Sequence, residues 1–416
     1  MLALETFNKL LRPEFHIFCR SWPSFHLCGL TGLAFAVSLV LALVAPRSLS
    51  PWIMLGISLT AVLTFLGLTL AVKVITGKET LVYYHHEIAV MVVCGLTLWL
   101  LRQPVLAYLD TTILGIGTFL AFGRIGCLMV GCCYGKPHTW GVCYHEEHAR
   151  AGVPSYLVGV RLFPSQAVES LWALGVVIVG SVLVWLGQPP GAALAWFVIM
   201  HDLGRFCLEF MRGDVGRPEL WGFSEAQWIA LGLTGLVVGA EFSGLLPFYG
   251  WHLAALIGLV TAMIAIAISR LLRRTPTHQL LHPRHVHEVA QAMVEGSNPP
   301  IRRMAVAGLE IAPPPLKIGR TSLGIQISSS QVKTPTGMIH HFTLSQVAGR
   351  LTPSTARVLA DLILKLQRRA GKSQLVEAKP GLFHLLIFHG RLDLKKQSRL
   401  AFNSVSIEEM RQRHGI

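Results

Sequence analysis

The sequence predicts an all-α polytopic membrane protein with about eight transmembrane helices, followed by a small C-terminal α+β soluble domain. Three observations support this prediction. The 416 residues are 52% hydrophobic and only 14% charged, whereas a typical soluble domain is about 25% charged. The apolar residues gather in long runs before residue 273. The net charge of +14 lies entirely in residues 270–416, because residues 1–269 contain 14 basic and 14 acidic residues. An ordinary cytosolic enzyme is therefore excluded.

Eight apolar runs are candidate membrane spans. A hydrocarbon core about 30 Å thick needs roughly 20 helical residues, so the short third run has to draw Tyr83 and Tyr84 into the interface. The first run is not expected to be a cleaved signal peptide, because it begins after residue 25 and no small-residue cleavage pattern closes it before Pro46. A large soluble helical protein is disfavoured, since soluble helices seldom lack charge over so many turns. The eight runs are residues 26–45, 52–74, 87–101, 104–122, 165–186, 191–210, 227–248 and 252–272.

The distribution of Lys and Arg between the loops bears on the topology. If the N-terminus is cytoplasmic, nearly all loop Lys and Arg residues of the apolar block lie on the cytoplasmic side, and Arg47 and Arg102 are the exceptions. Several of these charges can instead belong to a functional site at the membrane surface. The side of the membrane that holds the polar loops is therefore left open.

Arginines inside the apolar block are the first candidate functional residues. Arg124 ends the fourth run within the glycine-rich segment 123–137, and a charge there should face protein, water or a lipid phosphate. Arg205, Glu209 and Arg212 follow at spacings of four and three, which places them on one helix face. Glu209 can neutralise one arginine, and the other is then free to hold a phosphate through its planar fork. The structural alternatives are a snorkelling interfacial arginine and an ion-pair lock between helices.

Two further polar groups are expected at the same membrane surface. His85 and His86 open the third run, where a histidine can act as a general base near neutral pH or lie solvated in the interface. Ser165 and Glu169 open the fifth run, and both are also ordinary helix-start residues. Because the loops alternate between the two sides, these groups are predicted to converge with the arginines.

In this order the segments resemble the prolipoprotein diacylglyceryl transferase family. Segment 26–30 is similar to the family's His-Trp-Tyr-Gly-Leu, and segment 84–87 occupies the place of its Phe-His-Gly-Gly. Segment 123–136 aligns without a gap to the signature Gly-Arg-x-Gly-Asn-Phe-x-Asn-Gly-Glu-x-x-Gly-Arg. Segments 164–169 and 205–212 resemble Pro-Ser-Gln-Leu-Tyr-Glu and Phe-Arg-x-x-x-Glu-Phe-x-Arg, and Gln227 resembles the glutamine that opens the last span.

The resemblance implies a multi-pass enzyme of the bacterial plasma (inner) membrane that uses no cofactor. It would move the diacylglyceryl group of phosphatidylglycerol to the lipobox cysteine of a prolipoprotein and release glycerol phosphate. Arg124 and Arg212 would hold the lipid phosphate, while His85, or His86 if the register is shifted by one, would take the thiol proton. The implied substrate-binding residues are His26, Gly126, Cys127, Gly131, Cys132, Ser165, Gln166, Glu169, Arg205, Glu209 and Gln227.

Thiols replace polar residues of the family at three positions. Cys28 replaces a tyrosine, Cys127 an asparagine and Cys132 a glutamate, and thiols are weak hydrogen-bonding groups. Two alternatives therefore stay open. One is a phospholipid-dependent transferase of the same fold with a different acceptor and a cytoplasmic-facing site, and the other is a non-catalytic lipid-binding scaffold.

The cysteine-rich segment after the fourth run also raises a metal and a disulfide interpretation. No metal site is predicted, because the spacings differ from those of zinc ribbons and fingers and because adjacent cysteines are expected to point in different directions. A disulfide from Cys143 to Cys132 or Cys133 requires a loop that faces an oxidising compartment. The residues concerned are Cys127, Cys132, Cys133, Cys143, His138 and His145.

The end of the chain is predicted to be organised differently. The domain prediction is a transferase-like membrane block over 1–274, a proline-rich linker over 275–322 and a basic soluble domain over 323–416. The basic charge suits an anionic lipid surface, and no nucleic-acid partner is expected because no recognition motif is present. The elements expected in this domain are strands over 323–328, 338–344 and 382–388 and a helix over 352–369.

Overall fold

The computed structural model describes residues 8, 10–17, 20–77, 82–272, 277–297, 305–306, 309–310, 317–334, 337–367 and 372–389. The chain forms two compact units, Met1–Arg273 and Arg274–Ile416.

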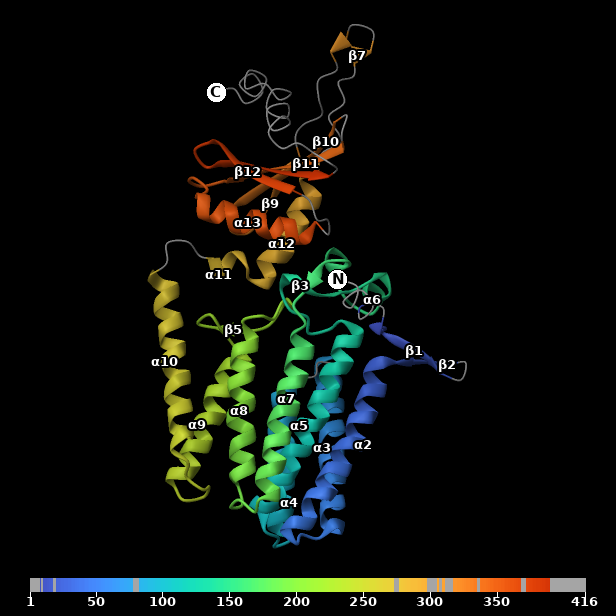
Figure 1. The fold of residues 1–416 in the computed structure, drawn as a ribbon, viewed down its shortest axis with the longest axis vertical. Coiled ribbons are helices and arrows are strands. Elements are labelled where there is room, and N and C mark those ends of the chain that lie inside the picture. Colours follow the sequence, from blue (N-terminus) through green and yellow to red (C-terminus); the bar gives the residue numbers. More distant parts are fainter. Residues whose placement is uncertain are drawn as a thin grey trace. The chain divides into compact units, whose positions relative to one another are not determined.

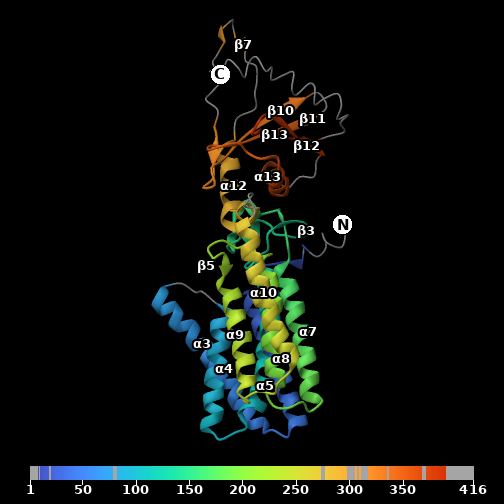
Figure 2. The same cartoon turned by 90° about the vertical axis from the view of Figure 1, so that its left-hand side faces the viewer.

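Within the first unit, the described residues form eight long helices that lie side by side (Figures 1 and 2). Five of them, α2, α3, α5, α7 and α10, are long and apolar enough to cross a membrane. The other three, α4, α8 and α9, have 18 residues each and contain acidic residues. The unit is thus that of a multi-pass membrane protein. The helices are α2 (Ser24–Val44), α3 (Pro51–Thr76), α4 (Tyr83–Leu100), α5 (Val105–Val130), α7 (Ser165–Trp185), α8 (Ala192–Glu209), α9 (Glu225–Phe242) and α10 (Gly250–Leu272).

Helix α5 lies at the centre of this unit. It packs against α2, α4, α7 and α8, and it is the most buried of the five apolar helices. Gly117 makes this packing possible, because a Cβ atom at this position would overlap the side chains of Phe197 and Val177. Helix α5 therefore positions the residues at its end relative to α7 and α8.

Short elements connect the long helices, and most of them follow α5. The segment between α5 and α7 contains a strand pair, β3 with β4, and a single helical turn, α6. The short elements are β1 (Glu14–Ile17), β2 (Arg20–Pro23), the 3₁₀ turns Ala45–Arg47 and Ser155–Leu157, β3 (Pro137–Cys143), α6 (Glu146–Arg150), β4 (Arg161–Leu162), β5 (Glu219–Leu220) and β6 (Phe223–Ser224).

A buried carboxylate ties α5 to the start of α8. Asp110 is fully buried and accepts hydrogen bonds from the backbone N–H groups of Gly191, at 2.9 Å, and Leu194, at 2.8 Å. Its Oδ2 lies 3.5 Å from Nη2 of Arg47. The first N–H groups of a helix have no partner within the helix, so Asp110 caps α8 from another helix.

The second unit contains a five-stranded antiparallel sheet with the strand order β12-β13-β11-β10-β9. Helices α12 and α13 contact each other and this sheet, and Figure 1 shows both on one side of it. The core is made of buried aliphatic and aromatic side chains such as Ile327, Phe342 and Ile363. The elements are α11 (Thr277–Leu280), α12 (Pro283–Glu295), β7 (Ala305–Val306), β8 (Leu309–Glu310), β9 (Gly319–Arg320), β10 (Ile325–Thr334), β11 (Gly337–Gln346), α13 (Pro353–Leu366), β12 (Lys372–Lys379) and β13 (Leu382–His389).

Two elements of this unit differ from the sequence expectations. Helix α12 lies inside the segment 275–322 that was expected to be a linker, and it packs on β9 and β10. Its proline is at the first helical position, where the missing N–H is harmless, so Pro283 starts a helix here. Strand β12 was not expected, because most of its side chains are polar and exposed. The expected helix over 352–369 ends earlier, at Leu366.

We expect Asp110→Ala to destabilise the protein. The substitution leaves two backbone N–H groups and the Arg47 guanidinium without their acceptor, and each unsatisfied buried group costs about 1–3 kcal/mol. The midpoint of thermal unfolding of the purified protein in detergent should fall. The control is Gln103→Ala, which removes an amide that donates to the nearby Leu101 carbonyl. Equal midpoints for Asp110→Ala and the unaltered protein would contradict the capping role.

Candidate functional site

A single carboxylate faces three arginines where α5, α7 and α8 meet. Glu169, near the start of α7, has an oxygen 3.0 Å from Nη2 of Arg124. Its other oxygen lies 3.6 Å from Nη1 of Arg205 and 3.9 Å from Nη1 of Arg212. All four residues are buried, with exposed fractions of 8% or less. The prediction of a converging polar cluster matches this arrangement for Arg124, Glu169, Arg205 and Arg212.

A second layer of ion pairs surrounds these residues. Arg205 Nη2 lies 3.0 Å from Glu209, and Arg217 also contacts Glu209. The guanidinium of Arg212 donates two hydrogen bonds, of 2.8 and 2.9 Å, to Asp214. Four arginines thus face three carboxylates, and the cluster retains a net positive charge.

Within this cluster, two buried guanidinium N–H groups have no hydrogen-bond acceptor among the described residues. They are Nε of Arg124 and Nη1 of Arg205. An unpaired buried donor is unfavourable unless a further group satisfies it. The cluster can therefore accept an anionic ligand with several oxygen atoms, such as a phosphate.

The glycine-rich loop after α5 is bound to its surroundings through backbone groups. Ser165 Oγ donates to the carbonyl of Cys133 at 3.0 Å, and Gln166 Nε2 donates to that of Cys132 at 2.7 Å. Gly135 forms a β-bridge with Arg212. The loop and the segment that follows α8 are therefore held together, although 77 positions separate Gly135 and Arg212.

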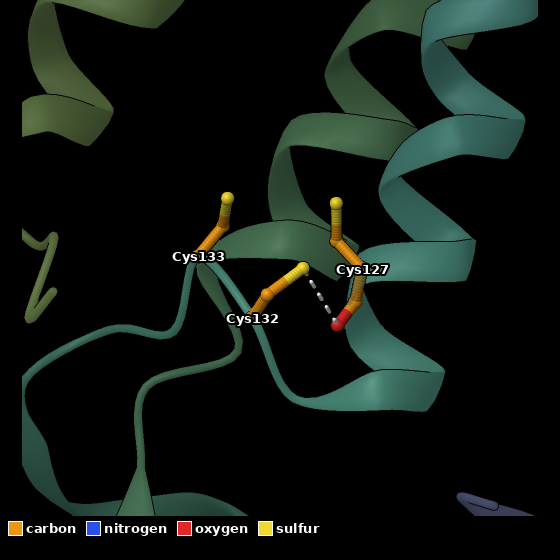
Figure 3. Close-up of side chains that lie close together, drawn as sticks. All are labelled: Cys127, Cys132 and Cys133. Atoms are coloured by element: carbon orange, nitrogen blue, oxygen red, sulfur yellow. Dashed lines mark hydrogen bonds between the residues drawn. The ribbon is translucent and has the colours of Figure 1, made fainter. Parts of the chain in front are cut away.

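Three cysteine side chains meet at this loop (Figure 3). The Sγ atoms of Cys127, Cys132 and Cys133 all lie within 4.8 Å of one another. The expectation that the adjacent cysteines point in different directions is wrong. Cys133 has a left-handed backbone with φ +56°, which turns its side chain toward the others. The described cysteines are all free, so no disulfide joins Cys143 to Cys132 or Cys133, and His138, Cys143 and His145 lie outside the group of three.

The thiol of Cys133 has an unusual electrostatic environment. Hydrogen bonds from the thiols of Cys127 and Cys132, followed by the positive charges of Arg212 and Arg124, hold the pKa of Cys133 well below its ordinary value, although burial opposes this effect. A lowered pKa favours the thiolate. The arginine cluster and the cysteines therefore form one continuous polar region.

The two candidate base residues have different environments. His85 Nε2 lies 2.9 Å from Oε1 of Glu225, and its side chain is 52% exposed. His86 is buried, its Nε2 lies 3.1 Å from the Thr69 hydroxyl, and its ring packs on Phe65. His85 is thus the accessible histidine of the pair.

The start of α4 lies close to the arginine cluster. The hydroxyl of Tyr84 donates a hydrogen bond of 2.8 Å to Asp202, which precedes Arg205 by three positions on α8. His85 follows Tyr84 directly, and its ring pairs with Glu225 at the start of α9 and not with an arginine of the cluster.

The other predicted binding residues make contacts within the fold, and their binding role stays a prediction. Gln227 caps α9 together with Ser224, and His26 is exposed with its ring near Phe25. Gly126 packs against α2, and Gly131 ends α5 with φ +88°. Two residues of the cluster, Asp214 and Arg217, were not predicted as site residues. The alternating charges directly after Arg212 were the sequence signal that could have indicated them.

A bundle of apolar helices that buries a cluster of positive charge identifies the kind of protein. It is a multi-pass membrane protein with a polar site at one end of its helices. Residues 51–242 match the family model of prolipoprotein diacylglyceryl transferase. The resemblance of the motifs is therefore confirmed for this part of the chain.

Three curated relatives are similar to part of the chain. It is 33% identical over 136 residues to phosphatidylglycerol–prolipoprotein diacylglyceryl transferase 2 of Clostridium perfringens, a match that covers 31% of this chain and 49% of the relative. The enzyme of Clostridium tetani is 31% identical over 132 residues, with 30% and 49% covered. That of Dehalococcoides mccartyi is 28% identical over 130 residues, with 31% and 48% covered. The chain thus spans about half the length of the curated relatives it matches.

We expect Glu169→Ala to destabilise the first unit by about 3–5 kcal/mol, because removing one partner of a buried ion cluster leaves uncompensated charge. The thermal midpoint and the yield of monodisperse protein in detergent measure this loss. Glu147→Ala, at an exposed position on α6, is the matched control.

A double variant tests the physical reason for this loss. Combining Glu169→Gln with Arg205→Gln removes one charge of each sign and should be more stable than Glu169→Gln alone. If the double variant has the lower midpoint, charge compensation does not explain the role of Glu169.

Proposed function

We propose that this protein transfers the diacylglyceryl group of phosphatidylglycerol to the lipobox cysteine of a prolipoprotein. The observation that carries the proposal is a pair of buried N–H groups, on Arg124 and Arg205, that have no acceptor in the described part of the chain and lie in the same ion cluster as Arg212. A phosphodiester at the membrane surface has oxygen atoms suited to such donors. The names of the curated relatives support the same reaction and favour neither a different acceptor nor a non-catalytic scaffold.

The reaction exchanges one bond for another. The acceptor sulfur attacks the carbon of the diacylglyceryl group that is bonded to a phosphate oxygen. A C–S bond forms at this carbon, and its C–O bond to the phosphate breaks. Glycerol phosphate leaves as an anion. Arg124 and Arg212 hold the lipid phosphate and stabilise the negative charge that develops on it, an effect worth several kcal/mol in a site with little water.

The acceptor thiol has to lose its proton before or during the attack. His85 is the base in this proposal, because it is accessible and pairs with Glu225. A carboxylate partner orients an imidazole and stabilises its protonated form. His86 is buried between α3 and α4 and belongs to their packing.

The same proposal also assigns the membrane location, the partners and the role of the second unit. All eight long helices cross the bacterial plasma membrane, and α4, α8 and α9 bury the acidic residues Glu87, Asp202 and Glu241 inside the bundle. Phosphatidylglycerol and a prolipoprotein are the partners. The compact unit that begins at residue 274, and not at 323, is a separate basic domain that rests on anionic lipid.

We expect Arg124→Ala and Arg212→Ala each to lower the transfer rate by about 100- to 1000-fold, since each removes a charge aimed at the phosphate. Lysine at either position should restore only part of the rate, because an ammonium lacks the planar fork. The assay measures glycerol phosphate released from labelled phosphatidylglycerol in the presence of a lipobox peptide. Arg150→Ala, an exposed position on α6, is the control, and normal release by the folded Arg124→Ala variant would overturn the phosphate-binding role.

The base assignment predicts different effects for the two histidines. His85→Gln should lower the transfer rate, because the glutamine amide cannot accept the thiol proton, whereas His86→Gln should retain most of the rate. The same assay of glycerol phosphate release measures both variants. A folded His85→Gln variant with an unchanged transfer rate would rule out His85 as the base.

A further inference from the structure

The thiols at the end of α5 are not the acceptor in the proposed transfer, since the acceptor sulfur comes from another protein. Cys127 comes from the helix itself, and Cys132 and Cys133 come from the loop that follows it. Figure 3 shows the three side chains around a common space, with Cys132 between the other two. Their sulfur atoms lie within 4.8 Å of one another.

The backbone holds this arrangement in place. Gly131 and Cys133 both have left-handed conformations, with φ +88° and +56°, and such a value is unfavourable for a cysteine unless the surroundings fix it. Here the carbonyl groups of Cys132 and Cys133 accept hydrogen bonds from Gln166 and Ser165. The three sulfurs are therefore brought together by the fold and not by chance rotation of their side chains.

We propose that Cys127, Cys132 and Cys133 bind one soft, thiophilic metal ion, and that Cu(I) is the ion that fits best. Thiolates prefer soft ions such as Cu(I) and Zn²⁺. Sulfurs bonded to one ion at about 2.3 Å are separated by roughly 4 Å, so a small inward movement completes the site.

The number of ligands favours Cu(I) over zinc. Structural zinc sites are almost always four-coordinate, whereas this group contains three cysteines and no further His, Cys, Asp or Glu among the described residues. Three-coordinate thiolate binding is ordinary for Cu(I). Cys132 is exposed, which gives an ion a route to the site from solvent.

The test titrates reduced, full-length protein in detergent with Cu(I) in competition with a coloured Cu(I) chelator. We expect one tightly bound ion per chain. Cys127→Ser, Cys132→Ser and Cys133→Ser should each lose this ion. Cys207→Ser, which removes an exposed cysteine on α8 outside the group, should retain it. Equal binding by the three variants and the control would overturn the proposal.

A second measurement uses the unaltered protein and does not depend on how the variants fold. Cu(I) should protect Cys127, Cys132 and Cys133 from alkylation, as located by mass spectrometry, while Cys207 continues to react. X-ray absorption of the loaded protein should give three sulfur neighbours for copper. Absence of protection, or a disulfide within the group in place of bound copper, would overturn the proposal. Neither readout involves lipid transfer, so the result is independent of the proposed function.

Discussion

The contact between Glu169 and three arginines is the constraint on which the rest of the first unit depends. It joins α5, α7 and the region after α8, and each of these segments brings a charge into surroundings that are otherwise apolar. A buried charge is stable only with a partner, so the helices have to meet where they do. The geometry of the same contact leaves donors on Arg124 and Arg205 without hydrogen-bond acceptors among the residues that the structure describes. The same group of charges thus fixes how the helices pack and provides donors that can bind an anion.

Much of this arrangement could be predicted from the sequence. The eight long helices lie close to the eight apolar runs, because hydropathy and length constrain a membrane helix strongly. The convergence of Arg124, Glu169 and Arg212 follows from the alternation of loops between two sides. The role of Asp214 was missed because a charged loop residue has no periodicity that reveals its partner.

Other features could not be predicted because they depend on backbone conformation or on tertiary packing. The left-handed φ of Cys133 is uncommon for any residue other than glycine, and it reverses the direction expected for that side chain. Helix α12 was hidden in a proline-rich segment, although Pro283 at its first position and the buried Val286 and Val289 are consistent with an amphipathic helix. The burial of His86, in contrast to His85, follows from the position of α3, which the sequence does not specify.

The cap that Asp110 provides for α8 has a consequence for the assembly of the protein in its membrane. Asp110 accepts hydrogen bonds from backbone N–H groups that lie up to 84 positions later in the chain. Helix α5 is therefore synthesised well before α8. Asp110 lies five positions after the start of α5, and a carboxylate that enters the hydrocarbon region without a partner is unfavourable. The transfer of α5 alone into lipid is therefore unfavourable until α8 has been synthesised. We therefore expect α5 and α8 to enter the membrane together, and not one after the other in the order of their synthesis.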